Sequence, residues 1–315
     1  MFRSLSRLIW VRFMALTPYH GELFKQRREA IVSVMKQGGY WSTIMGSGSE
    51  LSRVKEFLLR LSDEVPYAGG TAQQSPRFLP LFPGLKHKPI HAKEAFPWVR
   101  ELEASYPVIR REIDALEQNP QYFDYDADIR SGGAWLTHPF YFMGVKAQIF
   151  CEALPQTMAI LEKLPDLAWD YPWADALISA LEPGTHLIPH CSVDNLRLRC
   201  HLGIKIPADV SLRVGEEELL WKEGEVILFE DSFEHEVWHR GNERRIVLII
   251  DFWHPDLTPL EIKVLTAGFR KAQIRQILFD LRLDKSLGAF CDILRVEFAR
   301  QDEEPLIKAY WPQKI

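Results

Sequence analysis

One stretch of the chain, residues 196–206, alternates strictly between apolar and polar side chains. Its even positions hold leucine, cysteine or isoleucine, and its odd positions from 197 to 205 hold Arg, Arg, His, Gly and Lys. Side chains of a β-strand point alternately to its two faces, so the pattern predicts a strand with one packed face and one cationic face. On an exposed sheet the cations would be solvated, whereas inside a closed β-structure they would line a cavity suited to an anion.

Short apolar runs separated by turn residues surround this strand and predict a β-rich core. The runs lie at 176–181, 185–188, 196–206, 210–214, 217–221, 226–229, 236–238 and 245–252. About eight strands with turns at this spacing are typical of a double-sheet jelly roll, the cupin-like architecture.

Helices are expected on both sides of this core. Apolar spacing predicts helices over much of 1–60 and over 97–116 and 146–163, and Thr258, Pro259 and Glu261 supply the N-cap, first-turn proline and capping-box glutamate of another. We therefore expect a mainly β core with flanking helices. Residues 1–75 would form a helical N-terminal extension, 76–260 the β domain, and 261–315 a helical tail packed on the core.

Composition narrows the class of protein. The net charge is −5, from 38 basic and 43 acidic residues, which gives no overall electrostatic basis for binding nucleic acid. The four cysteines show no CxxC spacing, a pattern that favours reduced thiols in a cytoplasmic protein. No uncharged apolar run is long enough for a transmembrane helix.

The N-terminal region is basic and amphipathic. Residues 1–36 contain seven lysines and arginines against two acids, and Leu5, Leu8, Ile9, Phe13 and Leu16 form one apolar stripe. Such a helix can make peripheral contact with a membrane surface or bind an acidic partner. The alternative interpretation is a helix that packs on the domain and keeps its arginines in solvent.

Two histidines and one arginine occupy positions that suit a metal and a carboxylate. His190 lies just before the alternating strand, and His235 follows 45 residues later, just after the apolar run 226–229. Imidazoles from neighbouring strands suit a divalent transition metal. Arg245 directly precedes the apolar run 246–250, and a guanidinium beside such a run requires a carboxylate partner. A 2-oxoacid would satisfy both, but core histidines and a structural ion pair would give the same pattern.

Five short motifs carry a resemblance to a known family. They are ALEPGTH at 180–186, PH at 189–190, NLRLRCHLG at 195–203, FEDSFEHEVW at 229–238 and WHPDLT at 253–258. In order, spacing and identity these motifs resemble the aspartyl/asparaginyl β-hydroxylase family, over about residues 80–265. The resemblance implies a double-stranded β-helix that uses iron(II), 2-oxoglutarate and O2.

The resemblance also implies roles for particular residues. His190 and His235 match the two iron-ligating histidines, while Arg245 and Ser179 match the pair that holds the far carboxylate of 2-oxoglutarate.

Three further matches lie on the alternating strand. Arg199 and His201 match groups near the iron-chelating end of 2-oxoglutarate, and Arg197 matches a position that contacts a substrate carboxylate in amino-acid hydroxylases. Structural roles are expected for His186, His239 and His254.

Position 192 departs from the general oxygenase pattern, in which a carboxylate follows the first histidine by two residues. Here that residue is Ser192, and the β-hydroxylase family similarly lacks the carboxylate ligand. Either a water or Asp194 would complete the iron sphere, although the spacing of Asp194 from His190 is unusual. A site of this type also leaves a halogenase interpretation open.

The leading hypothesis is β-hydroxylation of an amino-acid residue, in a peptide or in a partner-bound biosynthetic intermediate. Hydroxylation of a lipid acyl chain at the membrane surface is a rival enzymatic function, favoured by the basic N-terminus. A non-catalytic jelly-roll binding module is the non-enzymatic alternative.

Overall fold

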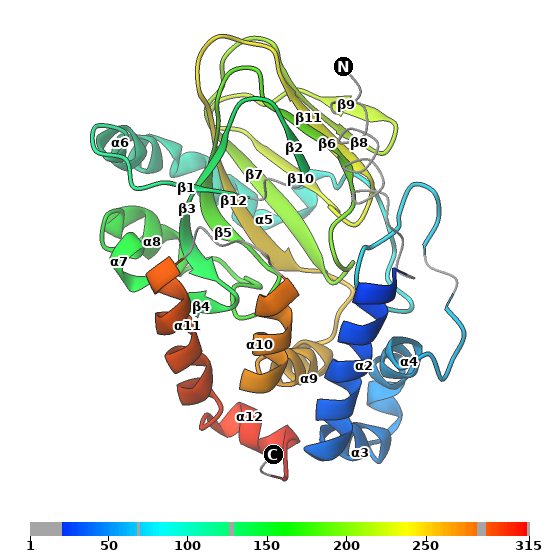
Figure 1. Ribbon diagram of the computed structural model, residues 1–315. Helices are drawn as coiled ribbons and strands as arrows, with labels where there is room; N and C mark the ends of the chain where they lie inside the picture. The colour runs from blue at the N-terminus through cyan, green and yellow to red at the C-terminus, as the bar shows by residue number, and fades with distance from the viewer. Residues whose placement is uncertain (1–20, 68–69, 126–128, 282–287, 314–315) are drawn as a thin grey trace, which may run out of the picture.

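Two antiparallel β-sheets form the core of the computed structural model, which describes residues 21–67, 70–125, 129–281 and 288–313 (Figure 1). The seven-stranded sheet has the order β1-β3-β5-β12-β7-β10, with β4 paired to β3, and the five-stranded sheet has the order β2-β6-β11-β8-β9. From β5 onward the chain crosses to the other sheet after each strand, except at β8 and β9, which pair with each other in the smaller sheet. This arrangement is the double-stranded β-helix, as the sequence predicted.

The strands agree closely with the predicted runs from residue 176 onward. The larger sheet contains β1 (Phe123–Asp124), β3 (Trp135–Phe142), β4 (Val145–Lys146), β5 (Ala176–Leu181), β7 (Arg197–Lys205), β10 (Val226–Phe229) and β12 (Arg245–Trp253). The smaller sheet contains β2 (Arg130–Ser131), β6 (His186–His190), β8 (Val210–Val214), β9 (Glu217–Leu219) and β11 (His235–His239). The first four strands were not predicted. The longest of them, β3, pairs with β5 and is buried along most of its length, so it lacks period-two alternation.

The apolar face of β7 packs outward, against helices. Leu198, Cys200, Leu202 and Ile204 belong to an apolar cluster shared with α5 (Pro97–Ala104), α6 (Tyr106–Leu116) and α8 (Pro155–Leu161). The opposite face, with its cations, is therefore directed between the two sheets. This confirms the prediction that one face of the strand packs and the other carries charge.

Two predicted helices are each divided in two. The segment 97–116 breaks at Ser105, where Pro107 starts a new first turn, and the segment 146–163 yields only the short α7 (Gln148–Cys151) before Pro155 begins α8. Proline fits a first helical turn but not a helix interior, so each proline starts a helix instead of lying within one.

Helices from both ends of the chain gather below the sheets (Figure 1). They are α2 (Glu22–Gln37), α3 (Tyr40–Met45), α4 (Ser52–Leu61), α9 (Pro259–Phe269), α10 (Ala272–Leu281), α11 (Gly288–Gln301) and α12 (Pro305–Tyr310). Their buried side chains form one apolar cluster, in which Tyr40 stacks on Trp311 at 5.0 Å between ring centroids. None of the described helices is long and apolar enough to cross a bilayer.

The predicted domain boundaries stay a prediction, although the two terminal groups of helices share this core. The apolar stripe predicted from Leu5 to Leu16 lies outside the described residues. Within α2, Ile31, Val32 and Met35 are buried, so this part of the basic N-terminal region packs on the protein.

The start of α9 provides a local test of the fold. Its predicted capping box is confirmed: the Thr258 hydroxyl accepts from the Glu261 amide, and the Glu261 carboxylate accepts from the Thr258 amide. Thr258→Ala should lower the free energy of unfolding by about 1 kcal/mol. Urea denaturation measures this loss, and Thr258→Ser, which keeps the hydroxyl, should retain most of the stability. An equal loss in both variants would contradict the capping role.

Candidate active site

Two histidines face each other between the ends of β6 and β11. His190 and His235 are register partners across these strands, and their ring centroids lie 4.1 Å apart. The Nδ1 atom of each ring lies within hydrogen-bond distance of a carbonyl two residues earlier, at 2.7 Å from Ile188 O and 2.9 Å from Phe233 O. A proton on Nδ1 leaves the Nε2 lone pair of each ring available to a metal.

Burial keeps both rings neutral. Burial, the largest cause, and nearby cations, among them Arg199 and Arg77, lower the pKa of His190 well below its usual value and that of His235 to about 4. Neutral imidazole is the form that coordinates a metal, so the pair fits iron(II) in its donor atoms and protonation state.

Arg245 lies deeper between the sheets without a carboxylate partner among the described residues. Its NH1 group is 3.3 Å from both the carbonyl and the hydroxyl of Ser179, its guanidinium lies 4.7 Å from the Trp221 ring centroid, and its buried Nε has no hydrogen-bond partner. Burial alone lowers the pKa of Arg245 to about 9. A desolvated cation of this kind is costly unless an anion binds against it.

A second unpaired donor belongs to His201. Trp221 Nε1 donates to Nδ1 of His201 at 3.3 Å, so the proton of this ring is on Nε2, which is buried and has no partner. Burial, with Arg245 and Arg199 nearby, lowers the pKa of His201 well below its usual value, so the ring stays neutral. The unsatisfied groups of Arg245 and His201 are donors, and they fit a bound carboxylate.

Two tryptophans lie beside these groups and were not predicted. Trp221 lies beside both Arg245 and His201, and Trp135 Nε1 donates to the Ser179 hydroxyl at 2.9 Å. Trp135 begins β3, the strand that the sequence did not reveal. Only the pairing of β3 with β5 brings Trp135 to Ser179.

Arg197 and Arg199 have acidic partners within the protein. Arg197 NH1 lies 2.6 Å from Asp231, while NH2 of Arg199 lies 2.6 Å from Asp175 and 2.8 Å from Asp251. The substrate role predicted for Arg197 and the cosubstrate role predicted for Arg199 stay predictions. Both guanidinium groups are already neutralised by buried carboxylates.

Ser192 and Asp194 are also engaged. The Ser192 hydroxyl accepts a hydrogen bond from Arg197 NH2. The Asp194 carboxylate accepts from the Tyr171 hydroxyl at 3.1 Å and from the Leu196 amide at 2.9 Å. Asp194 therefore has two internal donors, an arrangement typical of a structural carboxylate.

A separate cluster surrounds the fully buried Glu230, between β10 and β11. His87 Nδ1 and His91 Nε2 each lie 3.0 Å from its carboxylate, His254 Nε2 lies at 3.6 Å, and the Lys88 amide donates at 2.8 Å. Ligand atoms of His87, Glu230 and His254 lie within 4.8 Å of one another, a grouping that could hold a metal. Protein donors already satisfy the carboxylate, however, and the cluster links the segment 87–91 to the strands of the site.

The sequence interpretation missed the other members of this Glu230 cluster, although it assigned His254 a structural role. His87 and His91 are four residues apart in a loop, without the period of a strand or a helix to place them. The remaining two histidines with predicted structural roles have local partners: His186 Nε2 lies 2.6 Å from Glu236, and His239 Nε2 lies 2.7 Å from the Glu243 carbonyl.

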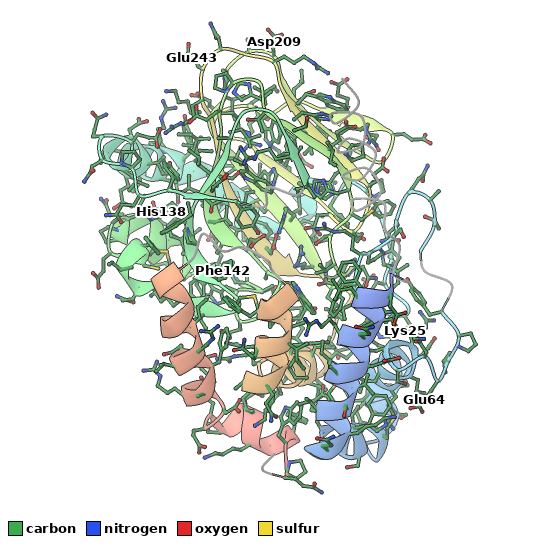
Figure 2. All side chains as sticks on the ribbon, viewed as in Figure 1. Lys25, Glu64, His138, Phe142, Asp209 and Glu243 are labelled. Carbon is green, nitrogen blue, oxygen red and sulfur yellow. The ribbon has the colours of Figure 1, made fainter. Side chains whose placement is uncertain are left out.

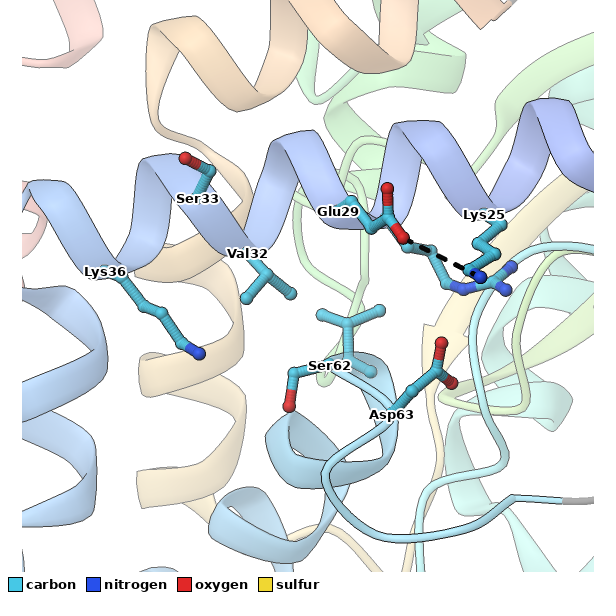
Figure 3. A pocket seen from close by; sticks show the side chains of 9 residues that line it. Lys25, Glu29, Val32, Ser33, Lys36, Ser62 and Asp63 are labelled. Carbon is cyan, nitrogen blue, oxygen red and sulfur yellow. Dashed lines mark ion pairs between the residues drawn. The ribbon is translucent and has the colours of Figure 1, made fainter.

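A hollow of about 460 Å³ lies elsewhere, between α2 and the end of α4 (Figure 3). Its lining carries both signs of charge, with Lys25 and Glu29 paired at 4.0 Å and Asp63 beside them. Figure 2 shows Lys25 and Glu64 at the helical end of the molecule, far from Asp209 and Glu243 at the opposite end of the sheets. Mixed charge gives this hollow no preference for either sign of ligand.

Fold and site together define a class: a double-stranded β-helix with two facing histidines at one end of an interior that leaves carboxylate-binding donors unpaired. Residues 103–255 match the sequence profile of the family described as Aspartyl/Asparaginyl beta-hydroxylase. This match confirms, over these residues, the resemblance that the five motifs predicted.

Curated relatives include proteins with different substrates. The chain is 36% identical over 172 residues to human aspartyl/asparaginyl beta-hydroxylase, across 54% of this chain and 23% of that protein. It is 32% identical over 185 residues to the ornithine lipid ester-linked acyl 2-hydroxylase of Rhizobium tropici, across 56% and 64%. The chain thus spans about a quarter of the human protein and under two thirds of the bacterial one.

Solved structures with similarity include an oxidoreductase of the 2OG-Fe(II) oxygenase family from Burkholderia pseudomallei, at 14% identity and a TM-score of 0.34, over 46% of this chain and 78% of that one. A prolyl-4-hydroxylase from Pseudomonas putida matches at 13% identity and a TM-score of 0.31, over 47% and 87%.

The Glu230 cluster should contribute strongly to stability. Burial would raise the pKa of Glu230, but hydrogen bonds from His254, His87, His91 and the Lys88 amide lower it below the ordinary 4.5. A lowered carboxyl pKa stabilises the fold above about pH 4.5 and loses that effect as the pH falls. Glu230→Gln should therefore cost about 3–5 kcal/mol at pH 7, because it leaves buried donors facing an amide.

Urea denaturation at pH 7 and pH 4 measures this effect, and the gap between Glu230→Gln and the wild type should narrow at the lower pH. The matched control is Glu64→Gln, which removes the exposed Lys36–Glu64 pair at 2.8 Å and should cost less than about 1 kcal/mol. A loss in Glu230→Gln that is small at pH 7, or equal at the two pH values, would contradict this account.

Proposed function

We propose that the chain is an iron(II)- and 2-oxoglutarate-dependent hydroxylase that acts on the β-carbon of an amino-acid residue in a peptide or a partner-bound intermediate. One observation carries the proposal. Among the described residues, the interior holds a buried arginine and a buried imidazole N–H without partners, Arg245 Nε and His201 Nε2, and the rings of His201 and His235 both pack on Phe229. A dicarboxylate chelated to a metal would satisfy all of them.

The side chains divide the work. His190 and His235 would hold the metal through Nε2, and Arg245 with Ser179 would bind the far carboxylate of 2-oxoglutarate. His201 would donate from Nε2 to the cosubstrate nearer the metal. Bound iron(II) and 2-oxoglutarate supply the oxygen activation that protein side chains lack.

The protein excludes water from this reaction. Phe229, Trp221 and Ile249 are buried in the apolar cluster between the sheets, next to the proposed cosubstrate site. Hydrogen bonds to a carboxylate are stronger in such a low-dielectric interior, and bulk water cannot compete for them.

A second candidate function is hydroxylation of a lipid acyl chain. The similarity to the Rhizobium tropici acyl 2-hydroxylase favours it, because the match spans more of that protein than of the human one. Lys25 and Lys36, exposed on α2, are paired with Glu29 and Glu64, so this helix adds no support for contact with an anionic surface.

Mass spectrometry separates the two candidates. Incubation with iron(II), 2-oxoglutarate and O2 should add one oxygen atom, about 16 Da, to aspartate- or asparagine-containing peptides and none to ornithine lipid in vesicles. His190→Ala and His235→Ala should each reduce iron binding and product at least about a hundredfold, because each removes one of two protein ligands. Product on the lipid alone would replace the first function with the second, and full activity of either variant would exclude the metal assignment.

Arg245→Met should change cosubstrate binding and apoprotein stability in opposite directions. Loss of the guanidinium should weaken 2-oxoglutarate binding by about 3–5 kcal/mol, a hundredfold or more, while the metal still binds. Without 2-oxoglutarate, the same variant should unfold at a higher temperature than the wild type, because it removes a buried unpaired charge.

Calorimetric titration of the Mn²⁺-loaded protein and thermal unfolding of the metal-free protein measure these two effects. Arg244→Met is a matched control, since Arg244 lies one residue earlier, is half-buried, and already pairs with Glu117 and Glu182. It should leave 2-oxoglutarate affinity unchanged. A lower unfolding temperature with unchanged affinity in Arg245→Met would show that Arg245 has a structural role instead.

A further inference from the structure

A segment from the N-terminal part of the chain crosses the ends of both histidine-bearing strands. The Arg77 amide donates to Ser192 O at 2.9 Å, and the Leu79 amide donates to Val193 O at 2.8 Å, just beyond His190. On the other side, the Glu234 amide donates to Gln73 O at 2.8 Å, directly before His235. Residues 73–79, here called the crossing segment, therefore lie beside the ends of the two strands that carry the histidines.

The Gln74 side chain helps to hold the crossing segment in place. Gln74 is buried, its Nε2 donates to the Ser232 hydroxyl at 2.9 Å, and it forms a β-bridge with Phe233. The crossing segment is thus held by main-chain and side-chain bonds on both sides of Arg77. A side chain on such a segment has a defined position relative to the two histidines.

Arg77 is the cation that this segment brings to the site. Its side chain is half-buried, its Nε is buried without a hydrogen-bond partner, and no described carboxylate lies within ion-pair distance of it. Its charge reaches both rings, since it contributes to the lowered pKa of His190 and of His235, after the effect of burial. Glu234, the acid directly before β11, is already paired with Arg213 at 2.8 Å.

The other arginines near the site differ from Arg77 in their partners or in their position. Arg197 and Arg199 are neutralised by buried aspartates, so neither guanidinium is free to bind a second carboxylate. Arg245 lies further inside, next to His201, where the cosubstrate is proposed to bind. Arg77 is the remaining partly buried cation beside the histidines, and it has no acid of its own among the described residues.

We propose that Arg77 binds a carboxylate of the peptide substrate and so selects acidic residues for hydroxylation. The inference rests on the proposed function, because it names the chemical group of the substrate that binds beside the proposed metal site. It moves the substrate-binding role from Arg197, which has internal partners, to a residue that lies outside the matched segment 103–255. A planar, partly buried guanidinium binds a carboxylate through paired hydrogen bonds.

Other arginines of the protein show how a guanidinium group is accommodated without a ligand. Arg53 donates to Glu261 at 2.8 Å and to the Asp256 carbonyl at 2.8 Å. The buried Arg275 has no hydrogen-bond partner among the described residues, and its guanidinium lies 5.1 Å from the centroid of the Phe298 ring. Arg77 has no acid or carbonyl partner for its guanidinium among the described residues, and its Nε is withdrawn from water. A ligand carboxylate would remove that cost.

The test measures binding of two peptides that differ in one charge. A fluorescent peptide with one aspartate flanked by alanine and glycine, and its asparagine counterpart, are titrated into protein loaded with Mn²⁺ and 2-oxoglutarate without oxygen. The wild type should bind the aspartate peptide more tightly. Arg77→Gln should weaken binding of that peptide about tenfold to a hundredfold and leave the asparagine peptide nearly unchanged.

Two further variants define the cause. Arg77→Lys, which keeps the charge, should restore part of the discrimination, and Lys86→Gln, which removes an exposed charge just beyond the crossing segment, should leave it intact. Unfolding temperatures of all variants show whether Arg77→Gln keeps the fold, since its main-chain bond to Ser192 remains.

The outcomes separate the two proposals. A wild type that binds neither Mn²⁺ nor 2-oxoglutarate overturns the proposed function itself. With both bound, equal wild-type affinity for the two peptides, binding of neither peptide, or unchanged discrimination in Arg77→Gln overturns the assignment of Arg77. Loss of discrimination in Arg77→Gln together with its partial recovery in Arg77→Lys supports it.

Discussion

A network of buried ion pairs between Arg197, Arg199 and three aspartates holds the interior of the double-stranded β-helix in register. Arg199 and Asp251 are register partners on β7 and β12, and Asp231 joins them from the loop between β10 and β11. Buried charges are costly, and mutual attraction compensates for that cost only when the geometry is good. The network thus ties the two central strands of the larger sheet to the loop that leads into His235.

The arginines of the interior differ in whether the protein itself neutralises their charge. Those on β7 are neutralised within the protein, whereas Arg245 on β12 is left with a hydroxyl, a carbonyl and an aromatic ring. The first arrangement favours a single conformation of the empty protein. The second leaves a buried charge unpaired until an anion binds, so the empty protein is less stable than its packing would allow.

Much of the fold could be predicted from the sequence, because β7 and its neighbours follow the period of two and because Thr258 and Glu261 form a local cap. The sequence also predicted that His190 and His235 come from neighbouring strands, and the two are register partners on β6 and β11. Partner identity could not be predicted in the same way: that Arg197 meets Asp231, or that His87 and His91 meet Glu230, depends on contacts between residues 34 to 143 positions apart. Buried strands such as β3 were missed because they lack a polar face.

The crossing segment separates two properties that active sites often combine. The residues proposed to hold the metal and the cosubstrate lie on strands of the β-helix, whereas residues 73–79 lie outside the matched segment 103–255 and are hydrogen-bonded to it. Relatives could therefore exchange this one segment and acquire new substrates while the oxidative chemistry stays unchanged. In this architecture, substrate selectivity can change through replacement of one segment, without change to the strands that carry the proposed metal ligands.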